Sequence, residues 1–238
     1  LTIRASTFTG NAAGDDGGAV RIENFATATI TTSTFSNNTA GPPIAQPGGG
    51  SGGAICVSDG QATITDCVLQ DNRGRVFGGA VYLGASPGAR VERCQFLRNQ
   101  AADSGGGLYV SNSITLLDCA FHDNVTHGGW GAAVRFDLNL CVFTMRGGEL
   151  RGNSSYPGGA LTANGGANGV VEHVIFEGNQ TPSGNGARGA AVRVWEPGTN
   201  VAFLGCAFRN NVADAIGAIV VDAGATALFD DCEIRGNH

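Results

Sequence analysis

Nine times in this chain a large apolar residue is followed three positions later by asparagine. Successive asparagines are 25 to 34 residues apart, and a small-small-small-aliphatic step such as Gly17-Gly18-Ala19-Val20 lies between them. A repeat of this length is typical of stacked coils, in which each coil contacts only its neighbours. We therefore expect residues 1–238 to form one elongated domain. The nine pairs are Phe8/Asn11, Phe35/Asn38, Leu69/Asn72, Phe96/Asn99, Phe121/Asn124, Leu150/Asn153, Phe176/Asn179, Phe208/Asn211 and Ile234/Asn237.

Two further apolar columns follow the same period. One column lies five positions before the large apolar residue. It is three positions before a second inward position, which itself lies two positions before that residue. Inward positions on one straight strand are an even number of residues apart, so this odd spacing indicates a bend between two short strands. The other alternates with outward neighbours after the glycines, as a half-buried strand does. The first column is Ile3, Ile30, Ile64, Val91, Leu116, Met145, Val171, Phe203 and Phe229. The second begins at Val20, Ile55, Val81, Leu108, Val134, Leu161, Val192 and Ile219.

These columns predict an all-β chain with three short strands in each coil. Stacked coils give parallel sheets, and parallel crossovers are right-handed in nearly all cases. The sequence therefore predicts a right-handed parallel β-helix, a β-solenoid of about nine coils of about 27 residues. The repeated asparagine fits a turn, since Asn tolerates the left-handed region and its amide can bind the asparagine of the next coil. We expect the nine asparagines to form an internal ladder.

Five of the seven cysteines occupy one position of the repeat, two residues before the large apolar residue. Alternation places them on the inward face, where cysteine packs as a small hydrophobe. We expect buried thiols, because side chains stacked in parallel register rarely reach the disulfide dihedral. There is no CxxC motif, so we predict neither a zinc site nor a cofactor. These cysteines are Cys67, Cys94, Cys119, Cys206 and Cys232.

The two motifs together resemble the repeat of the chlamydial polymorphic outer-membrane proteins, which pairs GGA and an aliphatic residue with FxxN. Strict first motifs lie at residues 17–20, 52–55, 78–81 and 158–161, and strict second motifs end at Asn11, Asn38, Asn99, Asn124, Asn179 and Asn211. The resemblance covers essentially the whole chain. It implies a surface-exposed, often adhesive β-helical passenger. It supplies no catalytic residue, and no membrane barrel is present in this sequence.

The amino-acid composition and net charge limit the classes of partner that the chain can bind. All 14 basic residues are arginine and the net charge is -6, which argues against a nucleic-acid partner. No apolar run approaches the roughly 18 to 20 residues of a membrane helix. We expect an extracellular or cell-surface location and a chain that continues beyond this segment. Its ends show no polar cap, so further coils or end-to-end self-assembly into a filament is a second expectation.

Outward positions after the glycine motif form a column rich in arginine and tyrosine. Such a strip can bind a glycan, with aromatic faces stacking on sugars and arginines binding carboxylate or sulfate. It can equally be a surface that merely covers the sheet. The candidate binding residues in it are Arg21, Tyr82, Tyr109, Arg135 and Arg193. Insertions at 39–51 and 180–188 leave one corner of the coil, where Trp130 and Tyr156 also lie, and we expect binding there too.

Many parallel β-helices are pectin-lyase-like enzymes that act on polysaccharides. The outward column before the cysteines offers Asp66, Arg93, Asp118, His173 and Asp231. Asp66 and Asp118 are expected about 9 to 10 Å apart, at the edge of the roughly 6.5 to 9.5 Å of inverting glycosidases. An acidic-basic-acidic column also simply avoids like-charge contacts. We expect a non-catalytic adhesion or structural module, with a polysaccharide-acting enzyme as the alternative.

Overall fold

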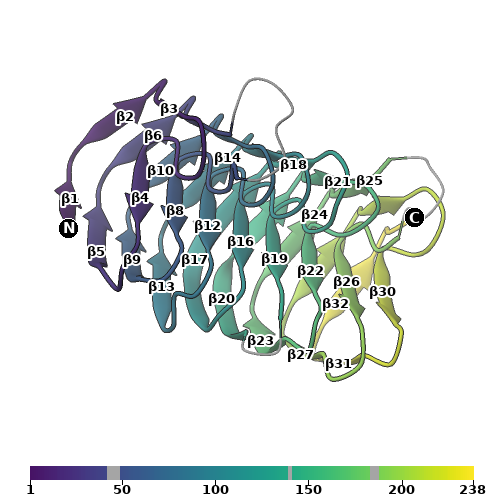
Figure 1. Ribbon diagram of the computed structural model, residues 1–238. Coiled ribbons are helices and arrows are strands. Elements are labelled where there is room, and N and C mark those ends of the chain that lie inside the picture. Colours follow the sequence, from purple (N-terminus) through teal and green to yellow (C-terminus); the bar gives the residue numbers. More distant parts are fainter. Residues whose placement is uncertain (42–48, 139–140, 183–187) are drawn as a thin grey trace.

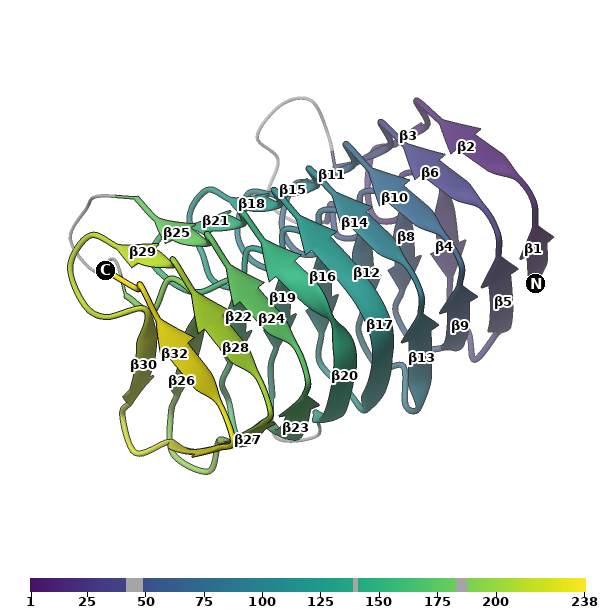
Figure 2. The ribbon, with the colours of Figure 1, turned by 180° about the vertical axis from the view of Figure 1, so that it is seen from behind.

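The computed structural model describes residues 1–41, 49–138, 141–182 and 188–238. Its strands pair in parallel from coil to coil and build three sheets, so that the chain winds into an elongated solenoid (Figures 1 and 2). Strands two to five residues long dominate because glycine-rich and left-handed turns interrupt the apolar pattern at each corner. The parallel β-helix predicted from the repeat is confirmed.

The first sheet has 16 strands in two rows that meet at a bend (Figure 2). The row that opens each coil is β1 (Thr2–Arg4), β5 (Thr27–Thr31), β9 (Gln61–Thr65), β13 (Ala89–Glu92), β17 (Ile114–His122), β20 (Val142–Arg151), β23 (Asn168–Glu172), β27 (Asn200–Leu204) and β31 (Thr226–Asp230). The row after the bend is β2 (Thr7–Thr9), β6 (Thr34–Ser36), β10 (Val68–Gln70), β14 (Gln95–Leu97), β24 (Ile175–Glu177), β28 (Ala207–Arg209) and β32 (Glu233–Arg235), and β17 and β20 continue through both rows.

The second and third sheets have eight strands each. The second sheet is β3 (Ala12–Ala13), β7 (Thr39–Ala40), β11 (Arg73–Gly74), β15 (Gln100–Ala101), β18 (Val125–Thr126), β21 (Ser154–Ser155), β25 (Gln180–Thr181) and β29 (Val212–Ala213). The third sheet, whose strands lie side by side in Figure 1, is β4 (Val20–Ile22), β8 (Ile55–Val57), β12 (Val81–Leu83), β16 (Leu108–Val110), β19 (Val134–Phe136), β22 (Leu161–Ala163), β26 (Val192–Trp195) and β30 (Ile219–Asp222).

Eight coils are complete, and β31 and β32 begin a ninth. We number them 1 to 9 from the N-terminus. A full coil carries four strand segments in three sheets, one more than the three expected. The additional segment is the two-residue strand that directly follows each ladder asparagine, such as β11 after Asn72. Two residues are too few to show the alternation by which a strand is recognised in a sequence.

The apolar columns pair in the predicted register. Phe35 lies between Phe8 and Leu69, and Ile30 lies between Ile3 and Ile64, so that each column runs through the centre of the solenoid. Identical rings stack along the column, with 4.5 Å between the ring centroids of Phe96 and Phe121. The core is therefore continuous from coil to coil.

Left-handed backbone marks the corners of each coil. The residue before every ladder asparagine has a positive φ, for example Asp71 at 56° and Asp123 at 54°. The ladder asparagines themselves are absent from this set, so our expectation that they occupy the left-handed region was wrong. A second left-handed residue, such as Thr32 at 51°, forms the bend within the first sheet at the position before the cysteine column.

The asparagines form an unbroken ladder. Asn124 donates from its side-chain amide to Asn153 Oδ1 at 3.0 Å and to the carbonyl of Phe96 at 2.9 Å, and its backbone N–H donates to the same Oδ1 at 3.0 Å. The amide of Asn99 in turn donates to Asn124 Oδ1 at 3.0 Å. The same side-chain bond joins each successive pair from Asn11 to Asn237. The ladder thus satisfies the backbone N–H groups that a coil leaves at this corner.

All seven cysteines are free thiols, six of them buried and Cys232 partly exposed. Cys67, Cys94 and Cys119 each lie near a main-chain oxygen two residues earlier in the chain. Burial raises the pKa of Cys119 to about 11 and that of Cys206 to about 11. These thiols therefore pack as small apolar groups at neutral pH.

Candidate binding face on the third sheet

The outward column of the third sheet runs from Arg21 to Val220 in continuous register. We expected an exposed strip, and this was wrong for most of its members: Tyr109 is 6%, Arg135 7% and Arg193 8% exposed. Arg21 at the N-terminal end remains exposed and forms ion pairs with Asp15 and Glu23. The column is outward but covered, because large side chains from the corners fold across it.

Aromatic rings cover the N-terminal part of this column. Phe77, at the corner before β12, stacks on Tyr109 with ring centroids 4.6 Å apart and on Tyr82 at 6.4 Å. The two tyrosines stack on each other at 5.4 Å. Burial raises the pKa of Tyr82, and burial together with the nearby Asp137 carboxylate raises that of Tyr109. Both phenols are therefore protonated donors at physiological pH.

The corner before the third sheet alternates large and small residues. Phe77 pairs with Ser104, and Trp130 pairs with Gly158. The small residue of each pair leaves room for the neighbouring ring to lie across the next coil. A Cβ on Gly158 would lie 2.9 Å from the carbonyl oxygen of Arg188 and 3.2 Å from Arg193 Cδ, which is too close for a side chain to be accommodated without a shift. The small residue at Gly158 leaves room for Trp130 to reach Trp195, two coils away.

Asp137 organises the centre of the face. Its Oδ2 accepts hydrogen bonds from the Tyr109 hydroxyl at 2.8 Å and from the Arg135 guanidinium at 2.8 Å. Its Oδ1 accepts from the Leu138 N–H at 2.9 Å and from the Asn164 amide at 2.9 Å. Four donors saturate this carboxylate, so it is a fixed anion that holds Arg135 flat on the sheet.

Trp130 and Trp195 form the C-terminal part of the face with the arginines beneath them. The Arg135 guanidinium carbon lies 4.9 Å from the Trp130 ring centroid, and that of Arg193 lies 4.7 Å from the Trp195 centroid. The two indole rings are 5.3 Å apart at their centroids. Each pair is a cation–π contact, which is favoured when the cation is desolvated. We call Trp130, Arg135, Arg193, Trp195 and Asp222 the Trp–Arg cluster.

Several buried polar atoms in this cluster lack a hydrogen-bond partner. Within the described residues these are the indole nitrogens of both tryptophans, Arg193 Nε and Asp222 Oδ1. Arg193 reaches Asp222 Oδ2 only at 3.4 Å, and Arg188 shares the same oxygen at 3.2 Å. Burial lowers the pKa of Arg193, and the Asp222 charge opposes that shift. Two donor types and one acceptor are thus left unsatisfied in one place, a condition that native proteins usually avoid.

The sequence analysis missed Asp137, Asn164, Trp195 and Asp222. Each lies two residues after the outward column, and residues i and i+2 of a strand lie on the same face. The equivalent positions in earlier coils hold Glu23, Ser58, Gly84 and Ser111, so the shift to large polar and aromatic residues begins in coil 5. The residue types at this second column therefore indicate the position of the site in the sequence.

The remaining sequence candidates are Tyr156 and the two insertions. Tyr156 is half-buried at the corner of coil 6 before Gly158. Residues 42–48 and 183–187, which make up much of the two insertions, lie outside the described residues, so the proposed role of those insertions remains a prediction. Near the second insertion, Arg188 binds Asp222 at the edge of the cluster.

The candidates for catalysis lie on the first sheet, at its left-handed bend. Asp66, Arg93 and Asp118 have φ values of 53°, 48° and 49°. Arg93 binds both oxygens of Asp66 at 2.7 and 3.0 Å, and this hydrogen bonding lowers the pKa of Asp66. Both side chains are exposed. Asp66 and Arg93 therefore form an ion pair between neighbouring coils. No group of three or more potential metal ligands occurs in the part of the chain that the structure describes.

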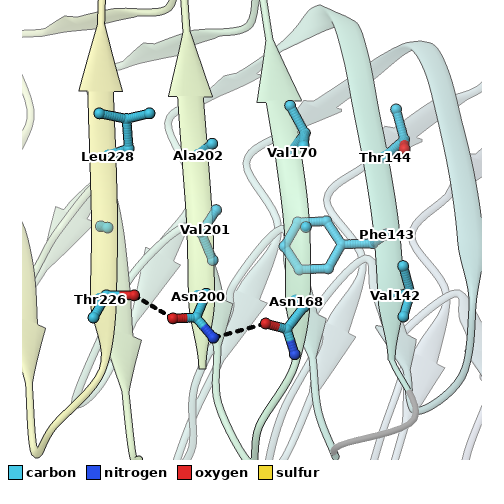
Figure 3. A pocket seen from close by; sticks show the side chains of 12 residues that line it. Val142, Phe143, Thr144, Asn168, Val170, Asn200, Val201, Ala202, Thr226 and Leu228 are labelled. Atoms are coloured by element: carbon cyan, nitrogen blue, oxygen red, sulfur yellow. Dashed lines mark hydrogen bonds between the residues drawn. The ribbon is translucent and has the colours of Figure 1, made fainter. Parts of the chain in front are cut away.

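A shallow apolar hollow of about 550 Å³ lies on the outer face of the first sheet across β20, β23, β27 and β31. Val170, Ala202 and Leu228 stand at the same height on neighbouring strands (Figure 3). The polar side chains at its edge are hydrogen-bonded to one another: Asn200 donates to Asn168 Oδ1 at 2.8 Å, and Thr226 bonds to Asn200. Its lining contains no ionisable side chain, so the hollow has no group that could transfer a proton or bind a charged ligand.

A family model described as "Right handed beta helix region" matches residues 1–179, well over half of the 238 residues. This match gives the hand of the winding. Comparison with curated proteins and with solved structures found no match. The described residues contain no helix with the length and apolar character needed to cross a membrane.

Proposed function

This chain belongs to the right-handed β-helix family, and we propose that it is a non-catalytic, surface-exposed adhesion module that binds a glycan through the outer face of its third sheet. The single observation that carries the proposal is the set of unpartnered polar atoms in the Trp–Arg cluster, beside two indole rings. The apolar face of a sugar can stack on the two partly exposed indoles, and its hydroxyls can pair with the buried polar atoms once the rings move aside to admit them.

The charges of the face favour an uncharged glycan. Arg135 is bound to Asp137, and Arg193 and Arg188 share Asp222. The Glu196 charge also acts on Arg193, so three carboxylates balance the three arginines that would otherwise bind a sulfate or uronate. A neutral sugar can instead bind the Arg193 and Asp222 atoms that have no partner, without displacing an existing one.

The hydrogen bonding of the face supports binding rather than catalysis. Asp137 accepts four hydrogen bonds, so it has no free lone pair with which to act as a general base. Glu196 likewise accepts from the Gly165 N–H at 2.8 Å and from the Asn164 amide at 3.4 Å. These carboxylates position neighbours. A polysaccharide-acting enzyme is the alternative, and it requires product release that is lost when Asp118 on the first sheet is changed to Asn.

The surface location rests on the resemblance of the repeat to chlamydial polymorphic outer-membrane proteins and on the net charge of -6. Labelling intact producing cells with an antibody against this chain tests the location, and staining that requires permeabilisation contradicts it.

Binding can be measured at the cluster itself, because Trp130 and Trp195 are the only two tryptophans in the sequence. We would titrate the 238-residue chain with neutral cello-, xylo-, malto- and galacto-oligosaccharides and with sulfated and uronate oligosaccharides, following tryptophan emission. A saturable change with a neutral sugar, insensitive to salt, is expected. Arg193→Gln should weaken it at least tenfold, whereas Leu228→Ala on the first sheet should leave it unchanged. Unaltered emission with every sugar, or equal affinity in Arg193→Gln, contradicts the proposal.

A further inference from the structure

Phe25 occupies a position in which a phenylalanine is unfavourable. The turn Glu23–Ala26 closes with a hydrogen bond from the Ala26 N–H to the Glu23 carbonyl at 3.2 Å. Its two central residues, Asn24 and Phe25, have φ values of 57° and 60°. These are the φ signs of a type I′ turn, in which glycine is preferred at the second central position. A bulky residue with positive φ is a backbone outlier that stores strain.

The equivalent turns in other coils carry glycine at this position. In coil 6 the turn 164–167 places Gly166 there, and in coil 8 the turn 222–225 places Gly224 there, each with the same closing hydrogen bond and φ values of 85° and 83°. The fold therefore needs no side chain at this corner. Phe25 is also 88% exposed, so its ring contributes little to the core. Neither packing nor turn chemistry explains it.

The Phe25 ring borders a concave pocket of about 490 Å³ at the corner between the third and first sheets of coils 1 to 4. Apolar surface comes from Phe25, Ala85 and Pro87, and hydrogen-bonding groups come from Asp59, Gln61 and Asn112. Asp59 Oδ1 accepts the Asn24 N–H at 2.6 Å, which fixes the carboxylate against the turn that carries Phe25. The pocket thus places one aromatic ring next to a carboxylate and two carboxamides.

A buried hydroxyl adjoins this pocket in the chain. Ser86 lies between the two lining residues Ala85 and Pro87, is 1% exposed, and its Oγ has no hydrogen-bond partner within the described residues. A buried polar atom without a partner requires an explanation. Ser86 itself does not line the pocket, so a buried water molecule, rather than a ligand in the pocket, would be its partner.

We propose that the Phe25 pocket is a second binding site, separate from the Trp–Arg cluster, that takes one pyranose unit of a neutral glycan. The sugar's apolar face stacks on the Phe25 ring, and its hydroxyls bind the carboxamides of Gln61 and Asn112 and the carboxylate of Asp59. The choice of a glycan rests on the proposed function. The existence of the site rests on the strained, exposed ring and the pocket that it borders.

The test uses Phe25→Gly, which removes the ring and installs the residue that the equivalent turns carry. If Phe25 serves folding, this variant loses stability. If it serves binding, Tm stays unchanged or rises while affinity falls. Leu138→Gly is the matched control, because Leu138 is also an exposed apolar residue with positive φ, at 74°, and lies at the same type of corner outside the pocket.

Calorimetric titration with the same neutral oligosaccharides gives the stoichiometry, and tryptophan emission reports separately on the Trp–Arg cluster. We expect two sites for the native chain and for Leu138→Gly, and one site for Phe25→Gly with its tryptophan response intact. Binding heat without any tryptophan response, abolished by Phe25→Gly, would support this pocket and contradict the proposed cluster site. No neutral sugar bound, equal stoichiometry in Phe25→Gly, or a fall in its Tm overturns the inference.

Discussion

Trp130 and Trp195 lie with their ring centroids 5.3 Å apart although they belong to coils 5 and 7. Coil 6 passes between these coils and carries Gly158 and Thr162 where a larger side chain would keep the indoles apart. Each ring also covers an arginine of its own coil. The cluster is therefore a property of three coils together.

Contact between the two indoles predicts a coupled signal in far-ultraviolet circular dichroism. Trp195→Phe should abolish that exciton couplet while the β-sheet spectrum is retained, because the second chromophore is lost and the coil remains paired. The measurement is a difference spectrum between the native chain and the variant. Tyr82→Phe, which keeps both indoles, should give no such difference, and an unchanged couplet in Trp195→Phe would show that the rings do not touch in solution.

Asn124→Ala should lower the free energy of unfolding by about 3 to 5 kcal/mol, because it removes four side-chain hydrogen bonds and leaves the buried backbone N–H of Asn99 unpaired. Urea denaturation measures the change. Asn11→Ala is the control: this exposed residue at the first rung donates to Asn38 and lies at the end of the ladder, so the loss should be below about 1 kcal/mol. Equal losses at the two positions would mean that the ladder is not cooperative.

Thr32→Gly should stabilise the chain by about 0.5 to 1 kcal/mol. A left-handed L-residue costs roughly 1 to 2 kcal/mol, and glycine recovers this less its own entropy of about 0.5 to 1. Thr32 is exposed with φ at 51°, and coils 6 and 8 carry Gly147 and Gly205 at the same bend. Thermal denaturation is the readout. The matched change Thr31→Gly, in β5, should instead destabilise, and a lower Tm for Thr32→Gly would contradict our account of the bend.

Phe121→Ala should cost about 3 to 5 kcal/mol of stability, as expected for a fully buried ring replaced by a cavity. The Phe121 ring stacks on the Phe96 ring, and Phe121 is paired in register with Leu150 of the next coil. Phe8→Ala, in the first coil, is the comparison, since that ring is only partly buried and packs on one neighbour. The loss there should be clearly smaller, and an unchanged Tm for Phe121→Ala would contradict the assigned core.

Stability should fall as pH rises above about 9. Burial raises the pKa of Cys119 and Cys206 to about 11 and that of Cys56 and Cys141 to about 12. Because the pKa is higher in the folded chain, the unfolded chain releases its thiol protons at lower pH. The folded state therefore keeps its full stability below the pKa of the unfolded chain and loses stability between pH 9 and 11. Each such thiol removes about 1 kcal/mol by pH 10. Denaturant midpoints from pH 7 to 10.5 measure this, and a smaller alkaline loss in Cys119→Ala is expected. A midpoint that rises with pH would refute the assignment.

The fold could be predicted because each apolar column repeats eight or nine times, and a register that satisfies one column satisfies the others. The two-residue strands after the asparagines could not, since Thr39–Ala40 and its equivalents are shorter than the period that would reveal them. Arg135 and Trp130 could be proposed for the site from their positions alone. Their burial could not, because it depends on Ser104 and Gly158 leaving space for rings from the coil before.

Asparagine paired with asparagine is the same contact at every level, so the ladder carries no information about which coil is which. A chain held together in this way tolerates duplication or loss of a coil wherever the levels above and below are interchangeable. The coils that carry the Trp–Arg cluster are not interchangeable in this way, because Trp130 and Trp195 meet only when a single coil with a glycine at its corner separates them. Insertion of one coil between residues 137 and 191 would leave the solenoid intact and erase the cluster, so recognition, rather than folding, limits how this repeat array can change in length.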